Sequence, residues 1–196
     1  MRNNEDWKKD LDCLLNARAI AVVGASEKVG PGRNTVYNLL HMDYKGRIYP
    51  INPSRKTVFE QKCFPSLAEL PEKPDLAVIA FGMNDGSTGV KTCTYIWNLL
   101  KIMAAVRAEN PRCEFILIAT SLPNPLSSFA TGMHEAYRPW VLRLGQKGVA
   151  VTDLTRLHRD MLAHKRFEDF NSNNINHPND FFARVYAQAL METLKQ

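Results

Sequence analysis

The chain has 196 residues, 45% of them hydrophobic, so it can bury one sizeable core, and its composition excludes a disordered or fibrous protein. Its 25 basic and 20 acidic residues give a net charge of +5, but Lys and Arg are scattered among Asp and Glu, which argues against nucleic-acid binding. No stretch approaches the roughly 20 apolar residues of a membrane span, and the N-terminus lacks a secretory signal pattern. We therefore expect a soluble, cytoplasmic protein that binds no membrane.

Strands and helices are expected to alternate along the chain. Short apolar runs bounded by turn residues predict strands over residues 19–23, 46–52, 76–80, 115–119 and 149–154. Helical patterns lie between them over residues 35–40, 95–109 and 136–146, and a last helix carries an apolar stripe from Phe181 to Leu194, with Pro178 in its first turn. This order predicts a three-layer α/β/α, flavodoxin-like single domain over residues 1–196, with five or six mainly parallel strands in one continuous sheet.

Three polar clusters follow predicted strands or precede the last helix. They are Gly24-Ala25-Ser26, Gly82-Met83-Asn84-Asp85 and residues 174–179, which place His177 on a loop. In open α/β sheets, ligands bind beyond the carboxyl ends of the strands. The four cysteines (Cys13, Cys63, Cys93 and Cys113) lack CxxC or metal-ligand spacing, so we expect reduced thiols and no metal site.

The first part of the chain carries a set of matching stretches, which read AIAVVGASEKVGPGRNTVYNLL, YKGRIYPINP, CFPSLAELP and PDLAVIA. From about residue 11 to residue 80 the chain resembles the CoA-binding, Rossmann-like domain of ADP-forming acyl-CoA synthetases and of small free-standing CoA-binding proteins. The resemblance implies that the loop after the first strand and the following helix N-terminus hold the CoA phosphates. The implied phosphate residues are Gly24, Ser26, Gly30, Gly32, Arg33 and Asn34, with Asn52 and Pro53 near the nucleotide.

The second part carries different stretches, which read PDLAVIAFGMNDGS, FILIATSLPNP, GVAVTDLTRLH and NNINHPNDFFARVYAQAL. From about residue 75 to residue 194 the chain resembles SGNH hydrolases, the esterase family also called GDSL. The resemblance implies that Asn84 of GMND donates to an oxyanion and that His177 of NHPND is the catalytic histidine. Because the two resemblances overlap only at PDLAVIA, we interpret the chain as a hybrid, natural or engineered, of a CoA-binding-like half (1–80) and a hydrolase-like half (81–196).

The preferred function is hydrolysis of small acyl esters, such as acetylated sugars, with no required cofactor. Ser26 falls where the hydrolase family has its nucleophile; it would attack the carbonyl, pass its proton to His177, and form an oxyanion that Asn84 stabilises. Two departures weaken this mechanism. Asn174 stands where the family often has Asp, and the sequence INPSRK stands where a glycine supplies a further oxyanion donor.

Each of these residues also has a purely structural interpretation. Ser26 suits a phosphate loop or helix cap, His177 a capping loop, and Asn84 and Asp85 the end of a strand. His41, His134, His158 and His164 lack a motif and are expected on the surface or in packing. Tyr95 and Trp97 are expected on the buried face of a helix.

Three alternatives to the esterase stay open. One is a binding module for CoA or a nucleotide, with the hydrolase half as scaffold only. Another is acyl-CoA thioester hydrolysis, in which a pyrophosphate would compete with the oxyanion for the same amides. The last is an inactive chimera. The sequence leaves the acyl preference and the oligomeric state open.

Overall fold

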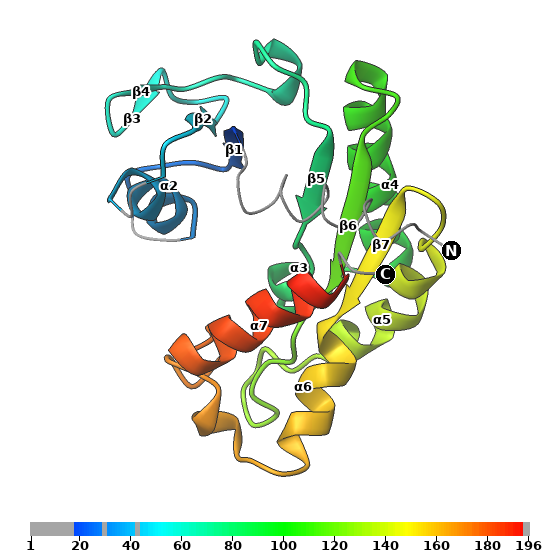
Figure 1. Ribbon diagram of the computed structural model, residues 1–196. Helices are drawn as coiled ribbons and strands as arrows, with labels where there is room; N and C mark the ends of the chain where they lie inside the picture. The colour runs from blue at the N-terminus through cyan, green and yellow to red at the C-terminus, as the bar shows by residue number, and fades with distance from the viewer. Residues whose placement is uncertain (1–17, 29–30, 42–43, 194–196) are drawn as a thin grey trace. The chain divides into compact units, whose positions relative to one another are not determined.

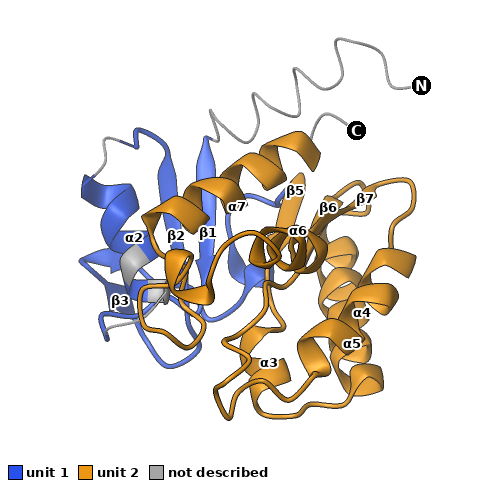
Figure 2. Ribbon diagram, turned by 90° about the horizontal axis from the view of Figure 1, so that it is seen from below, with its two compact units in different colours: residues 1–74 blue, residues 75–196 orange. Residues whose placement is uncertain are grey.

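The computed structural model describes residues 18–28, 31–41 and 44–193. The chain divides into two compact units, unit 1 over residues 1–74 and unit 2 over residues 75–196 (Figure 2). Each unit is described by itself below. The single domain that we expected over the whole chain stays a prediction.

In the residues that the structure describes, unit 1 is built on two parallel strands and the helix between them (Figure 1). Strand β1 (Ala19–Val23) leads to α2 (Pro31–His41) and then to β2 (Arg47–Ile51), which pairs with β1 in parallel from Ala19 opposite Arg47 to Val23 opposite Ile51. The short hairpin of β3 (Thr57–Val58) and β4 (Gln61–Lys62) and the 3-10 turn η1 (Leu67–Glu69) follow. One buried cluster of its core contains Val22, Ala25, Val36, Val58 and Cys63. Because the ladder is parallel, the carboxyl ends of β1 and β2 meet at one edge.

An ion pair ties β2 to the chain beyond η1. Arg47 Nε and Nη2 lie 2.5 and 2.6 Å from the two carboxylate oxygens of Glu72, and the Tyr49 hydroxyl donates to the same carboxylate. The hydrogen bonds from Arg47 and then Tyr49 lower the pKa of Glu72 to about 2. This exposed contact joins β2 to the segment that follows η1.

Unit 2 contains a parallel sheet in the order β5-β6-β7, formed by Leu76–Ile79, Glu114–Ala119 and Val149–Asp153. The helices are α3 (Met83–Ser87), α4 (Thr92–Glu109), α5 (Met133–Arg143), α6 (Leu154–Leu162) and α7 (Asp180–Thr193), with the 3-10 turn η2 (Phe167–Asp169) before α7. Helices α4 and α5 lie on one face of the sheet and α7 on the other (Figure 2). The central strand β6 is buried from Phe115 to Ala119, because it is paired on both edges and covered on both faces.

The α/β class is confirmed, and the five expected strands are all present, each paired in parallel within its own sheet. In the described residues, however, hydrogen bonds join them into a two-stranded and a three-stranded sheet, and each sheet belongs to one unit, where we expected a single continuous sheet. Helices α2, α4 and α5 begin three or four residues before the predicted starts. In α2 and α4 the first turn carries polar or small residues that do not follow the apolar period.

Some details of the sequence prediction were wrong. Pro178 is not in the first turn of the last helix, which begins at Asp180; it forms a bridge with Asn171. Trp97 is 58% exposed, whereas Tyr95 is buried as expected, because the two residues lie on opposite sides of α4. Leu194, at the end of the expected stripe, lies outside the described residues.

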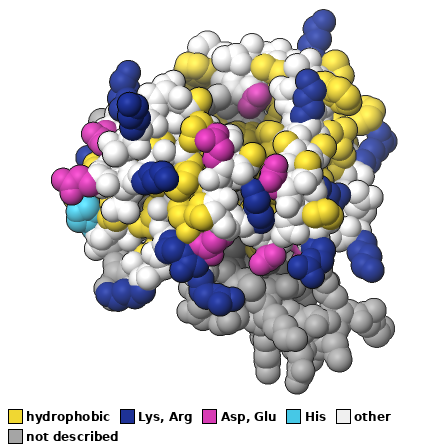
Figure 3. Space-filling view, turned by 90° about the horizontal axis from the view of Figure 1, so that it is seen from above, with side chains coloured by type: hydrophobic (Ala, Val, Ile, Leu, Met, Phe, Trp, Pro, Cys, Tyr) yellow, Lys and Arg dark blue, Asp and Glu magenta, His cyan; other side chains and the backbone are white. Residues whose placement is uncertain are grey.

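The charge distribution on the surface and the state of the cysteines agree with the expectations from the sequence. On the face shown in Figure 3, Lys and Arg side chains lie among Asp and Glu side chains. Cys63, Cys93 and Cys113 are free thiols, and Cys13 lies outside the described residues. No helix in the described part of the chain is both long and apolar enough to cross a membrane.

Candidate functional site

The loop after β1 is held against the end of β2. Gly24 has a φ of +77°, in the left-handed region that glycine tolerates and other residues rarely adopt. The N–H groups of Gly24 and Ala25 both donate to the carbonyl of Ile51, at 2.9 and 3.2 Å. Ala25 is fully buried. The chain therefore turns sharply at the carboxyl end of β1 and brings Ser26 to the edge of the two-stranded sheet.

Asn52 joins this loop to the end of β2. Its side-chain nitrogen Nδ2 donates to the carbonyl of Ala25 at 2.9 Å, and its Oδ1 accepts from the N–H of Ser54 at 2.9 Å. Its own N–H donates to the carbonyl of Phe64 at 2.9 Å. Asn52 thus holds the loop after β1 with its Nδ2 and the turn after β2 with its Oδ1, and the following residue, Pro53, is exposed.

The Ser26 hydroxyl has a local structural partner. It accepts a hydrogen bond from the N–H of Lys28 at 3.0 Å and lies 3.4 Å from the Lys28 carbonyl. This is the short turn that Ser hydroxyls commonly form with the backbone two residues on. The contact agrees with the structural interpretation of Ser26, and its role as a nucleophile stays a prediction.

The first turn of α2 follows the loop. Helix N-termini leave N–H groups without intrahelical acceptors and carry a partial positive charge, which suits anions. Pro31, the first residue of α2, needs no acceptor, and the first turn, which contains Gly32 and Asn34, has no acidic residue. Gly30 lies outside the described residues.

Arg33 is stacked against an aromatic pair. Its guanidinium carbon lies 5.2 Å from the centroid of the Tyr37 ring and 5.7 Å from that of Phe59. Phe59 and Glu60 connect β3 to β4 with φ of +48° and +63°, a turn that usually takes Asn or Gly. The N–H of Phe59 donates to Glu27 Oε1 at 2.9 Å, which fastens the hairpin to the loop after β1. The sequence of this hairpin contains no typical turn residue. The sequence analysis therefore did not predict the hairpin or the contact between Phe59 and Glu27.

In unit 2, strand β5 leads into the turn that carries Asn84. Gly82 has a φ of +114°, and its N–H donates to Asp85 Oδ2 at 3.2 Å, closing the first turn of α3. The Tyr95 hydroxyl donates to the Phe81 carbonyl at 3.1 Å. Asn84 is exposed at the carboxyl end of β5, where the sequence predicts it, and Asp85 has the structural role that we expected.

A pocket of about 410 Å³ opens next to this turn. Phe81 and Asp85 line it from the turn, and Tyr95, Leu99 and Ile102 line it from α4. Burial raises the pKa of the Tyr95 hydroxyl, which donates to the Phe81 carbonyl. Asn98 and Lys101 of α4 also line the pocket, so a mostly apolar wall carries a carboxylate, an amide and an ammonium group that can orient part of a small ligand.

His177 lies in a tight turn before α7. The side-chain oxygen of Asn173 accepts from the N–H groups of Ile175, Asn176 and His177, each at 3.0 Å. The carbonyl of His177 accepts from the N–H of Ser172 at 2.8 Å. We call residues 173–177 the histidine turn. The His177 side chain is exposed, on a loop as the sequence predicts, and its pairing with Ser26 stays a prediction.

Two other histidines are buried in unit 2. The His134 ring on α5 contacts the Met83 carbonyl at 2.9 Å through Nε2, and the His158 ring on α6 accepts from the N–H of Leu122 at 3.1 Å through Nδ1. Burial lowers the pKa of both. Both are packing residues, as the sequence allowed, and the His134 contact holds the helix that carries Asn84.

Comparison with known proteins separates the two parts of the chain. The family model described as CoA binding domain matches residues 18–95, less than half of the chain. The ADP-forming acetate–CoA ligase II of Archaeoglobus fulgidus is 44% identical over 72 residues, which are 36% of this chain and 11% of that protein. The match thus spans about a tenth of the curated relative, and it confirms the resemblance of the first part of the chain to CoA-binding domains.

Solved esterase structures share the fold over most of the chain. A carbohydrate esterase family 3 protein from Talaromyces cellulolyticus aligns over 90% of this chain and 96% of its own, with 17% identity and a TM-score of 0.52. The structure of TesA aligns over 90% and 98%, with 21% identity and a TM-score of 0.53. At these identities the likeness shows the fold alone. The chain therefore combines a stretch similar in sequence to CoA-binding domains with an α/β fold that esterases also have.

Proposed function

We propose that unit 1 binds CoA, or a nucleotide of the same phosphate chemistry, at the loop between β1 and α2. The observation that carries this proposal is the hydrogen bond from Asn52 Nδ2 to the Ala25 carbonyl, because it fixes the loop beside a helix N-terminus without acidic residues. A loop fixed beside a helix N-terminus leaves the N–H groups of the first helical turn to meet a phosphate at little entropic cost. The sequence match over residues 18–95 supports the same ligand.

Each candidate residue has a defined part in this proposal. Gly24, Gly30 and Gly32 let the pyrophosphate approach the backbone, and the Ser26 hydroxyl and Asn34 add hydrogen bonds. Arg33 supplies the positive charge, with its guanidinium held by the rings of Tyr37 and Phe59. Asn52 and Pro53 lie on the nucleotide side. The ligase reaction of the relatives is not part of the proposal, since the match spans about a tenth of their length. We also propose a cytoplasmic location, which agrees with the free thiols of Cys63, Cys93 and Cys113.

Titration calorimetry with CoA tests this function. We expect binding by the wild-type chain and a loss of about 10- to 100-fold in affinity for Arg33→Ala, the range for losing one charge-assisted hydrogen bond. Arg112→Ala removes the same charge from an exposed position in unit 2 and should leave the affinity unchanged. No heat with the wild-type chain, or equal affinity for wild type and Arg33→Ala, contradicts the proposal.

A second candidate function is hydrolysis of small acyl esters, with Ser26 as nucleophile, His177 as base and Asn84 as oxyanion donor. The observation that favours it is the exposure of Asn84 and His177, both on hydrogen-bonded turns of unit 2. The turn that carries Asn84 also adjoins a mostly apolar pocket. The mechanism requires the Ser26 hydroxyl within hydrogen-bond reach of the His177 ring, so that its proton moves to the ring as the oxygen attacks the carbonyl.

Turnover of p-nitrophenyl acetate tests the second function. We expect release of p-nitrophenol that is lost in both Ser26→Ala and His177→Ala. His164→Ala serves as a matched control, since this histidine is also exposed in unit 2 but lies outside the two turns. Turnover that persists in either site variant removes the mechanism.

A further inference from the structure

Asn124 is a buried polar residue to which the sequence drew no attention. It lies on the loop between β6 and α5, and only 6% of its surface is exposed. A buried amide must satisfy its donors and its acceptor, because an unpaired buried polar group destabilises the fold. The hydrogen-bond partners of Asn124 therefore show which segment the loop between β6 and α5 contacts.

Two of these partners, Asn174 and Ile175, belong to the histidine turn. Asn124 Nδ2 donates to the Asn174 carbonyl at 2.9 Å and lies 3.3 Å from its side-chain oxygen. The N–H of Asn124 donates to the Ile175 carbonyl at 2.8 Å. On its other side, Asn124 Oδ1 accepts from the N–H of Leu126 at 2.9 Å, which keeps the amide in one orientation. Asn124 thus fastens the loop after β6 to the turn that carries His177.

These contacts accompany an unusual backbone conformation at Asn174. This residue has a φ of +56°, a left-handed conformation that Asn tolerates better than most side chains. It occupies the place, three residues before His177, where the hydrolase resemblance implies an aspartate. In this chain both its carbonyl and its side-chain oxygen face the Asn124 amide nitrogen. Asn174 therefore serves the connection between the two loops.

We infer that Asn124 is a positioning residue that sets the place of His177, through Asn174, for the ester hydrolysis proposed above as the second function. The inference rests on that function. Asn suits the position because one planar group must donate to a carbonyl and accept from a backbone N–H at the same time. Aspartate has the same shape but would set a negative oxygen against the Asn174 carbonyl, so the turn would move away. A displacement of about 1 Å in a catalytic group costs up to about 100-fold in rate.

The test is Asn124→Asp, assayed with p-nitrophenyl acetate. We expect kcat to fall about 10- to 100-fold with little change in KM, because the base moves while the ester still binds. Hydrogen exchange at the Ile175 and His177 amides should also become faster. Asn110→Asp is the matched control, because it removes an Nδ2 contact to Asp75 elsewhere in unit 2, and it should leave kcat unchanged.

The outcomes separate this inference from the function on which it rests. Turnover that survives His177→Ala overturns the ester hydrolysis itself. Turnover that needs His177 but has the same kcat in Asn124→Asp and wild type overturns the positioning role alone. A fall in kcat of the same size in Asn110→Asp also overturns it, because the effect would then be general destabilisation.

Discussion

The Nδ1 atom of His158 accepts a hydrogen bond from the N–H of Leu122, at 3.1 Å, in the core of unit 2. The other ring nitrogen, Nε2, is buried and has no partner among the described residues. Three aromatic rings surround the imidazole, those of Phe167, Phe170 and Phe182. With only 2% of the residue exposed, burial lowers the pKa of His158 from 6.5 to about 4.

This burial predicts a pH-dependent stability. Between pH 6.5 and pH 4 the unfolded chain binds the His158 proton and the folded chain does not, so the free energy of unfolding falls as the pH falls. The loss is up to about 3 kcal/mol at pH 4. Urea unfolding of wild type and His158→Phe from pH 7 to pH 4 measures it, and the variant should lose less stability over that range. His164→Phe, the same change at an exposed histidine, should keep the wild-type slope; equal slopes for all three chains would refute the prediction.

Gly86 allows α3 to pack on His134. A Cβ added at Gly86 would lie 2.6 Å from two atoms of the imidazole ring, far inside normal contact distance. Gly86→Ala should therefore destabilise the chain by about 1–3 kcal/mol, the usual cost of overpacking. A double-mutant cycle with His134→Ala measures the coupling by chemical denaturation. The alanine at residue 86 should cost less once the ring is gone, and additive effects would show that the ring is not the obstacle.

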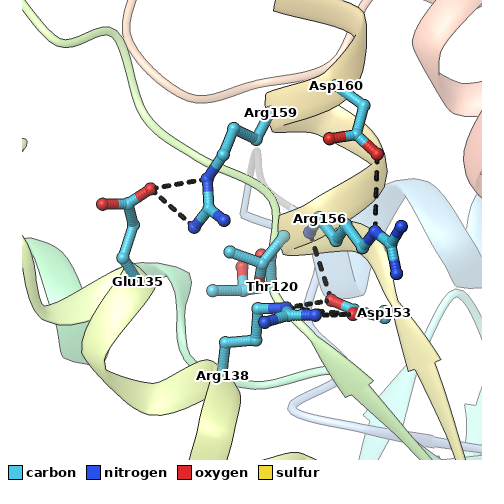
Figure 4. A network of polar contacts seen from close by, with 8 residues as sticks. Thr120, Glu135, Arg138, Asp153, Arg156, Arg159 and Asp160 are labelled. Carbon is cyan, nitrogen blue, oxygen red and sulfur yellow. Dashed lines mark hydrogen bonds and ion pairs between the residues drawn. The ribbon is translucent and has the colours of Figure 1, made fainter.

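Asp153 holds α5 and α6 at the end of β7 (Figure 4). Its carboxylate accepts from Arg138 Nε and Nη2, at 2.7 to 2.9 Å, and from the N–H of Arg156 at 3.1 Å as the N-cap of α6.

Asp153→Ala should lower the free energy of unfolding by about 1–2 kcal/mol, mainly through the lost cap. Asp153→Asn should cost less, because an amide oxygen can still cap the helix. Asp160→Ala removes an exposed partner of Arg156 and should change stability by less than about 0.5 kcal/mol. Equal losses in the three variants would contradict this ranking.

Asn52 should control CoA affinity through the loop that it holds. Asn52→Asp replaces the donor to the Ala25 carbonyl by a carboxylate oxygen and adds a negative charge near the proposed phosphates, so we expect at least about tenfold weaker binding. Asn52→Ala should weaken binding less, because it adds no charge. Asn38→Asp adds the same charge to an exposed position on α2 and should bind CoA as wild type does. Titration calorimetry compares them, and wild-type affinity in Asn52→Asp would exclude this role.

The strands could be predicted from the sequence because a strand that is buried on both faces consists of an unbroken run of apolar residues. Residues 115–119 are apolar without interruption, and β6 is buried over that whole run. Helix α6 was missed for a local reason: it begins at Leu154, directly after β7, and Asp153 is both the last strand residue and the cap of the helix. With no turn residues between them, the pattern reads as a longer strand.

The sequence predicts where some of the candidate residues lie in the fold, and their roles stay predictions. Positions next to strand ends, such as Ser26 and Asn84, follow from the polar residues after apolar runs. Asn124 and Phe59 could not be found in this way. Asn124 acts through contacts with residues 50 positions away, and Phe59 depends on a left-handed turn that its residue type disfavours. Such residues are recognised by their partners, which a single sequence does not show.

Amide hydrogen exchange of the full chain with and without CoA tests the central claim most directly, because it reports where the ligand sits. We expect saturating CoA to slow exchange at the amides of residues 24–28 and of the first turn of α2, and to leave residues 173–177 unchanged. Binding that slows exchange only in unit 2, or no change at residues 24–28, would contradict the account.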